Sequence, residues 1–153
     1  MQEENRKSSF PIVMLLVSVA LWMASLSNVA FYLGNHESMK GLTVLILGSI
    51  FVSLDIRYCA AYANYVWLAA IVLLALRKKV VPVHAALWGL ALLAFSVKAV
   101  HVDEAGNTAD IVRYGAGFYL WYAAFAVATI GTFAGKNKER KATTLVDGTK
   151  NDA

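Results

Sequence analysis

One stretch decides the fold: GLTVLILGSIFVSLDIRYCAAYANYVWLAAIVLLAL, residues 41–76, in which only Asp55 and Arg57 carry charge. It is too long for one membrane span and too short for two. Its first part, Gly41–Leu54, would form a helix of about 21 Å, against a bilayer core of about 30 Å. We therefore expect Gly41–Leu54 to dip into the outer leaflet without crossing. Asp55-Ile56-Arg57 would mark its exit, and Tyr58 would begin the second span.

Three other apolar runs are long enough to span a bilayer: Phe10–Leu33, Val80–Val100 and Tyr114–Ala134. The sequence therefore predicts an all-α integral membrane protein. Its expected architecture is a four-span helical bundle with a short re-entrant or interfacial helix between spans 1 and 2. The alternative is that Gly41–Leu54 also crosses, which gives five spans.

The composition agrees with a membrane location. The chain is 59% hydrophobic and only 16% charged, whereas a soluble domain has about 25% charged residues. Its net charge of +4 comes from short basic clusters beside apolar runs. That placement is typical of cytoplasmic loops next to lipid headgroups and not of nucleic-acid binding.

The distribution of Lys and Arg favours a defined orientation in both models. Four spans place four of the 14 basic residues outside, namely Lys40, Arg57, Lys98 and Arg113, and ten inside. Five spans, with the N-terminus outside, give nine inside and five outside. Both obey the positive-inside rule, but span length favours four. We expect a cytoplasmic N-terminus over residues 1–9, a transmembrane helical domain over 10–134, and a disordered basic cytoplasmic tail over 135–153.

Polar residues inside the apolar runs are candidates for function. Asp55 and Arg57 are either a substrate or ion site at the tip of the re-entrant segment, or a boundary where the two charges reach water or each other. Asn64 lies within a span, where an amide either joins neighbouring helices or contacts a ligand.

Aromatic residues form two clusters. Tyr58, Tyr62 and Tyr65 have helical spacing, and the last span repeats the pattern with Tyr114, Phe118, Trp121, Tyr122 and Phe125. The clusters indicate either an aromatic belt at the outer headgroups or an aromatic vestibule that binds a ligand or partner. The candidate interaction residues are Asp55, Arg57, Tyr58, Tyr62, Asn64, Tyr65, Tyr114 and Trp121.

No catalytic or cofactor motif is present. His36, His101, Asp103 and Glu104 share the outer side in the four-span model but match no metal-site spacing. His84 is either a proton-relay residue or a side chain that reaches water at the inner end of its span. We therefore expect no catalytic residues, no cofactor and no metal. Small residues recur four apart and favour close helix packing or self-association: Ala20 with Ala24, Ala124 with Ala128, and Gly131 with Gly135.

Two short elements carry a resemblance. They are Tyr62-Ala63-Asn64, followed by an apolar run that ends at Arg77-Lys78-Lys79, and Tyr114-Gly-Ala-Gly-Phe-Tyr-Leu-Trp121. From Gly41 to Phe133 the chain resembles small polytopic bacterial inner-membrane proteins, which have Tyr-Ala-Asn-Pro and Gly-Tyr-Trp-Leu-Trp-like elements. Tyr65 stands here where their proline would be. The resemblance implies a bacterial inner-membrane location and no particular activity.

The expected function is that of a non-enzymatic multi-pass membrane protein. We expect it to act through helix–helix contacts, either as an immunity protein against a membrane-inserting toxin or as an accessory subunit of a membrane complex. The alternative is an oligomeric small-solute transporter or channel subunit, with Asp55, Arg57 and Asn64 on its path. The expected partners are the lipid bilayer and a membrane protein or a second copy, and not nucleic acid.

Overall fold

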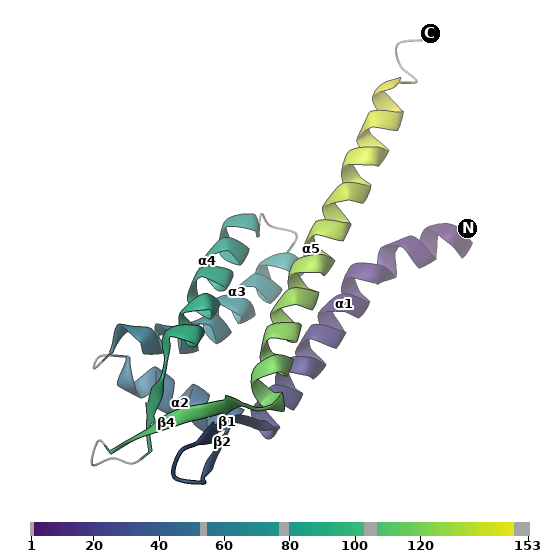
Figure 1. Cartoon of the computed structure of the whole chain (residues 1–153). Coiled ribbons are helices and arrows are strands. Elements are labelled where there is room, and N and C mark those ends of the chain that lie inside the picture. The colour runs from purple at the N-terminus through teal and green to yellow at the C-terminus, as the bar shows by residue number, and fades with distance from the viewer. Residues whose placement is uncertain (1, 53–54, 77–79, 103–106, 149–153) are drawn as a thin grey trace.

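The computed structural model describes residues 2–52, 55–76, 80–102 and 107–148, with side chains described inside these ranges between 12 and 133, Ala75 excepted. It is mostly helical, with a four-stranded sheet at one end (Figure 1). The helices are α1 (Gln2–Ser27), α2 (Gly41–Phe51), α3 (Ala63–Ala75), α4 (Val81–Leu93) and α5 (Ala116–Gly148), with 3₁₀ turns η1 (Ile56–Tyr62) and η2 (Ala94–Ser96). The strands are β1 (Val29–Leu33), β2 (Ser38–Lys40), β3 (Ala99–His101) and β4 (Thr108–Tyr114).

The four longer helices run away from the sheet. α1 and α5 lie antiparallel and side by side, and both chain termini point away from the sheet (Figure 1). Two helical stretches are long and apolar enough to cross a membrane, Ile56–Leu74 and Ala116–Phe133. The apolar parts of α1 and α4 are shorter, Ile12–Ser27 and Val81–Ser96. The structure thus confirms a mostly helical fold with two candidate membrane-spanning helices among the described residues, but it does not show a four-span bundle.

The sheet corrects the prediction of an all-α fold. Its strand order is β2-β1-β4-β3, and every pair is antiparallel. β2 and most of β4 lie in the sequence between the predicted apolar runs. In the β1–β2 turn His36 adopts a positive φ of 67°.

The first apolar run also ends earlier as a helix than predicted. α1 stops at Ser27 because Asn28 turns the chain, with its side-chain Nδ2 donating to the Ala24 carbonyl at 2.8 Å. The next residues, VAFYL, are rich in aromatic and β-branched types that suit a strand. They form β1, whose Phe31 pairs with Tyr114 of β4. The helical backbone of α5 continues to Gly148. That the tail from residue 135 on is disordered in water stays a prediction.

Small residues bring α1 and α5 together. Gly117, Ala124 and Gly131 recur every seven residues on α5 and are buried. A repeat of seven keeps one face of a helix turned toward its partner. Ser25 and Ser18 of α1 face this row, and Ser18 Oγ donates to the Ala124 carbonyl at 2.7 Å. The predicted Ala20–Ala24 pair is not the contact on α1, because Ala20 is exposed.

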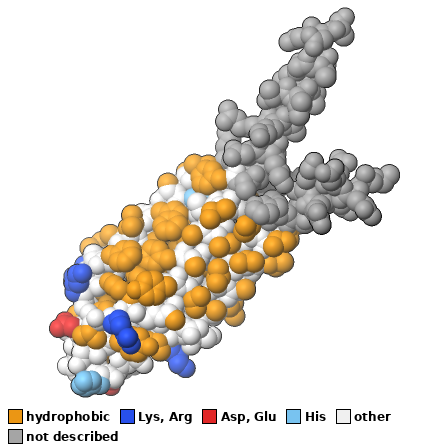
Figure 2. All heavy atoms as spheres, turned by 45° about the vertical axis from the view of Figure 1, so that its right-hand side comes forward, with side chains coloured by type: hydrophobic (Ala, Val, Ile, Leu, Met, Phe, Trp, Pro, Cys, Tyr) orange, Lys and Arg blue, Asp and Glu red, His pale blue; other side chains and the backbone are white. Residues whose placement is uncertain are grey.

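The surface separates apolar from charged side chains. Apolar side chains cover most of the visible body, and charged ones gather at the end that carries the sheet (Figure 2). Exposed apolar residues occur on each long helix, for example Leu16 (α1), Val72 (α3), Leu92 (α4) and Ile130 (α5). Exposed apolar surface of this extent is typical of a surface that contacts lipid or another protein.

The α1–α5 contact yields a first prediction. A Cβ at Gly117 would collide with the carbonyl oxygens of Ser25, Asn28 and Val29. Gly117→Ala should therefore lower the free energy of unfolding by about 1–3 kcal/mol, measured by thermal unfolding in detergent with circular dichroism.

Gly89→Ala is the matched control, because a Cβ at this α4 position meets nothing within 4 Å. This variant should be neutral or stabilised by up to about 1 kcal/mol, owing to the higher helix propensity of alanine. Equal losses in both variants would contradict the assigned helix contact.

Candidate functional site

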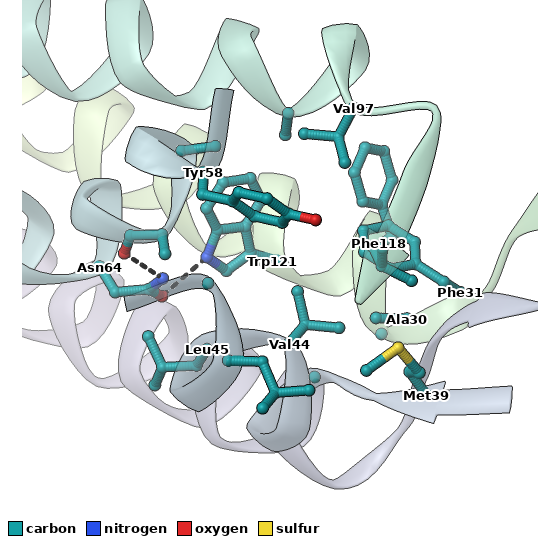
Figure 3. Close-up of a pocket in the computed structure, with 18 of the residues that line it drawn as sticks. Ala30, Phe31, Met39, Val44, Leu45, Tyr58, Asn64, Val97, Phe118 and Trp121 are labelled. Carbon is teal, nitrogen blue, oxygen red and sulfur yellow. Dashed lines mark hydrogen bonds between the residues drawn. The ribbon is translucent and has the colours of Figure 1, made fainter. Parts of the chain in front are cut away.

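The candidate site is an apolar cavity of about 90 Å³ beneath the sheet (Figure 3). α2 forms one wall, η1 and η2 form another, and residues of β1, β2 and β3 cover the cavity on the side of the sheet. The beginning of α5 and the end of α1 close the far side. Most lining residues are apolar: Leu26, Ala30, Phe31, Met39, Val44, Leu45, Leu47, Phe51, Ala60, Ala61, Ala94, Val97, Val100, Phe118 and Trp121.

Small side chains leave this space open. Ala30, Ala60 and Ala94 are buried in its walls with relative exposures of 5%, 7% and 7%. Gly48 of α2 brings that helix against η1, where a Cβ would lie 2.9 Å from the Cβ of Ala61. Gly48 and Ala61 therefore let α2 and η1 pack closely. The short side chains of the three buried alanines leave the space between the elements open.

Asn64 lies at the inner end of the cavity and joins three helices. Its Oδ1 accepts from the indole Nε1 of Trp22 on α1 and of Trp121 on α5, each at 2.8 Å. Its Nδ2 donates to the Ala61 carbonyl at 2.9 Å. Asn64 is only 5% exposed, so it serves first as the interhelical contact that the sequence offered as one of two alternatives.

The indole N–H groups of the other two tryptophans also donate to a polar side chain on another helix. Trp67 Nε1 donates to Ser18 Oγ at 3.1 Å, and Trp88 Nε1 donates to Thr129 Oγ1 at 3.1 Å. Every buried side-chain nitrogen or oxygen in the described part of the chain has a hydrogen-bond partner. Because Trp67 and Phe125 fill the space below Asn64, the cavity does not continue into this lower layer.

His84 lies away from the cavity, in this lower layer between α4 and α5. It is 3% exposed. Its Nε2 lies 2.9 Å from Thr132 Oγ1, and its Nδ1 lies 3.3 Å from Thr129 Oγ1. Since the side chain is buried among helix contacts, it does not reach water in the way that one sequence interpretation required.

The charged edge of the cavity is the Asp55–Arg57 pair. Arg57 Nε donates to Asp55 Oδ2 at 2.8 Å, Nη2 donates to the same oxygen, and the Arg57 backbone N–H donates to Oδ1 at 2.8 Å. These bonds from Arg57 hold the pKa of the Asp55 carboxyl below its ordinary value. Asp55 also caps the start of η1, so the pair marks the boundary between α2 and the next helix.

Tyr58 and His101 form the polar contact beside this pair. The Tyr58 hydroxyl lies 2.9 Å from His101 Nδ1 and 3.4 Å from the Ala99 carbonyl. The His101 ring stacks on Phe51 of α2, with centroids 4.6 Å apart. The tyrosine ring lies inside the cavity (Figure 3), and its hydroxyl joins η1 to β3.

The predicted interaction residues fall into two groups. Arg57, Tyr58, Asn64 and Trp121 line the cavity, and Asp55 is bound to Arg57 at its edge. The remaining three do not line it: Tyr62, Tyr65 and Tyr114.

The predicted stripe of Tyr58, Tyr62 and Tyr65 is split. Tyr62 and Tyr65 are 38% and 51% exposed, and Tyr58 turns inward. The stripe was predicted with a single helical period, but η1 is a 3₁₀ helix through Tyr62 and α3 begins only at Ala63. The two segments turn by different angles per residue, so the three rings do not share one face.

The second aromatic cluster faces the interior and not the headgroups. Phe118 and Phe125 are buried, and Tyr114 stacks on Phe118 with centroids 4.2 Å apart. The outward aromatic on this part of α5 is Tyr119, which is 62% exposed. The cluster packs inside the protein, and a vestibule that binds a ligand or partner stays a prediction.

Several lining residues were not singled out from the sequence. They come from α2 and the strands, as with Val44, Met39, Phe31 and Val97. Gly48, inside an apolar helix, was the available signal for close backbone approach. The strand residues could not be recognised, because a short apolar strand that follows an apolar helix shows no hydrophobic periodicity that distinguishes it from the helix.

The described residues contain no group of three or more His, Cys, Asp or Glu side chains placed to hold a metal ion. Asp103 and Glu104 lie outside the described residues. What the cavity offers chemically is therefore apolar surface with a polar edge. A dry apolar cavity takes apolar molecules in preference to water.

The Asn64 contact yields a second prediction. Asn64→Ala leaves the Trp22 and Trp121 indole N–H groups without their acceptor. It should lower the free energy of unfolding by about 1–3 kcal/mol. Denaturation in mixed detergent micelles, followed by tryptophan fluorescence, measures this change.

Asn35→Ala provides the control, because Asn35 is exposed in the β1–β2 turn. Its effect should stay within about 0.5 kcal/mol. An Asn64→Ala protein as stable as wild type would show that the indoles find other partners at no cost.

Comparison with known proteins adds no identity to this geometry: no protein family, no curated protein and no solved structure matches the chain.

Proposed function

We propose that this chain is a multi-pass membrane protein that crosses the bilayer four times. The crossings would be α1, η1 with α3, α4 with η2, and α5. No Asp, Glu, Lys or Arg occurs in residues 8–36, 58–76, 80–97 or 114–135, so each crossing has a charge-free core. α2 would lie in the outer leaflet at the level of the cavity.

The arrangement of the ends supports this topology. The start of α1, the end of α3 and the start of α4 lie on the side away from the sheet (Figure 1). In the sequence, ten of the 14 basic residues come before the apolar part of α1, between α3 and α4, or after the apolar part of α5. By the positive-inside rule we propose that this side is cytoplasmic, in a bacterial inner membrane, and that the sheet faces outward.

Thiol labelling tests the topology. In a Cys59→Ala background, Ser38→Cys in β2 should react with a membrane-impermeant maleimide added outside. Asn5→Cys should react only after the membrane is made permeable. Labelling of Asn5→Cys from outside would contradict four crossings.

Within this topology we propose that the protein binds the apolar chain of a membrane amphiphile. The observation that carries the proposal is the cavity of about 90 Å³ with its apolar lining. A binding role fits better than transport because the described layer below Asn64 is packed with Trp67, Leu87 and Phe125, all at 0% exposure. Toxin immunity and a role as an accessory subunit stay predictions from the sequence.

Filling the cavity tests the binding role. Ala60→Leu adds three carbons to a buried wall position. It should lower by about tenfold the amount of lipid that stays bound to the protein after washing in non-ionic detergent. Native mass spectrometry measures the retained lipid.

Ala69→Leu is the matched control, because Ala69 is exposed on α3 and the same added carbons should not reduce retention. Both variants should show wild-type helix content. Unchanged lipid retention in a folded Ala60→Leu protein would refute the binding role.

A further inference from the structure

We propose that the cavity takes a segment of one acyl chain of a zwitterionic phospholipid from the outer leaflet, and that the Arg57–Asp55–His101 edge holds its headgroup. This inference rests on the proposed function and names the class of ligand. Three features of the described residues carry it: the position of α2, the donors left free at the edge, and the charge of the edge.

α2 indicates that the occupant comes from the bilayer. Leu42, Ile46 and Ile50 form its outer stripe, with exposures of 49%, 51% and 61%. Its opposite face, with Val44 and Gly48, lines the cavity. A helix that is apolar on both faces is not stable against water, so its outer stripe lies in lipid. The cavity is then separated from the acyl chains of the bilayer by one short helix.

The polar edge offers hydrogen-bond donors. The Tyr58 hydroxyl has one hydrogen, and we assign it to the shorter contact, the 2.9 Å one to His101 Nδ1. With its Nδ1 bound to Tyr58, His101 leaves its Nε2 without a hydrogen-bond partner among the described residues. Arg57 uses Nε and Nη2 on Asp55, and its Nη1 likewise has no acceptor in the described part of the chain.

Free donors at an apolar cavity call for a headgroup rich in acceptors. The phosphodiester of a phospholipid supplies such oxygens, and the planar guanidinium of arginine suits them. A hydroxyl headgroup, as in diacylglycerol, would satisfy fewer of these donors and would leave the Arg57 charge without a new partner.

The charge of the edge selects among phospholipids. Arg57 and Asp55 are bound to each other and opposite in charge, so the pair has no net charge. A zwitterionic headgroup complements it, because its phosphate meets Arg57 while its ammonium faces the carboxylate of Asp55. A headgroup with phosphate alone would bring a second anion near Asp55 without a compensating cation.

Native mass spectrometry of the full-length protein tests the ligand class. The delipidated protein in non-ionic detergent is offered three probes with the same chains: dioleoyl phosphatidylethanolamine, dioleoyl phosphatidylglycerol and dioleoylglycerol. We expect phosphatidylethanolamine adducts to exceed each of the others by about tenfold, as expected for loss of one charge-assisted contact. Equal or better retention of phosphatidylglycerol or dioleoylglycerol overturns the headgroup assignment.

Substitutions at the edge test the residues. Arg57→Gln should remove the preference for phosphatidylethanolamine over dioleoylglycerol. Arg113→Gln, a control at the same end of the molecule whose guanidinium lies 4.2 Å over the Tyr32 ring, should keep it. If Arg57→Gln fails to fold, Arg57→Lys keeps the charge beside Asp55 but loses the planar fork, and should weaken the preference. A preference unchanged in a folded Arg57 variant overturns the assignment.

The two proposals fail in different ways. Ala60→Leu should reduce retention of all three probes, because it blocks the space for the chain. If it does not, the binding role itself is wrong. If Ala60→Leu reduces retention but no Arg57 variant changes the order of the probes, the cavity binds a chain and the headgroup assignment alone is wrong.

Discussion

The structure depends on giving each indole N–H an acceptor inside an apolar body. An unpaired polar group costs several kcal/mol in hydrocarbon, so each tryptophan must find its partner on another helix. Asn64 meets this need for Trp22 and Trp121, Ser18 for Trp67, and Thr129 for Trp88. These bonds set the depth at which α1, α3, α4 and α5 stand against one another, and apolar packing fills the spaces between them.

The cavity follows from where this hydrogen-bonded layer ends. Below Asn64, Trp67 and Phe125 occupy the space between helices. Above it α2, a short helix, lies across the gap, and small residues at Ala30, Ala60 and Ala94 take the place of large ones. The Asn64 side chain thus lies at the upper limit of the packed layer and forms the inner wall of the cavity. A binding site at this level needs no rearrangement of α1, α3, α4 or α5.

The sequence was a good guide where a feature is local and a poor one where it depends on distant partners. The break at Asp55 and Arg57 was predictable, because two charges cannot continue an apolar helix, and the structure places a helix boundary there. Asn64 was recognisable as a polar residue in a span. β1 was not predictable, because VAFYL follows an apolar helix without interruption and becomes a strand only by pairing with β4, some 80 residues later. The inward direction of Phe118 and Trp121 was hidden for the same reason, since their partners lie on other elements.

The pairing of β1 with β4 also orders the assembly of the molecule. β1 follows the first helix, and β4 immediately precedes the last, so the centre of the sheet joins the two ends of the chain. While the chain is synthesised from its N-terminus, β1 and β2 can form a hairpin, but the β3–β4 half does not yet exist. The cavity therefore remains incompletely enclosed until α5 has been synthesised. Completion of the chain and enclosure of this space are then one event.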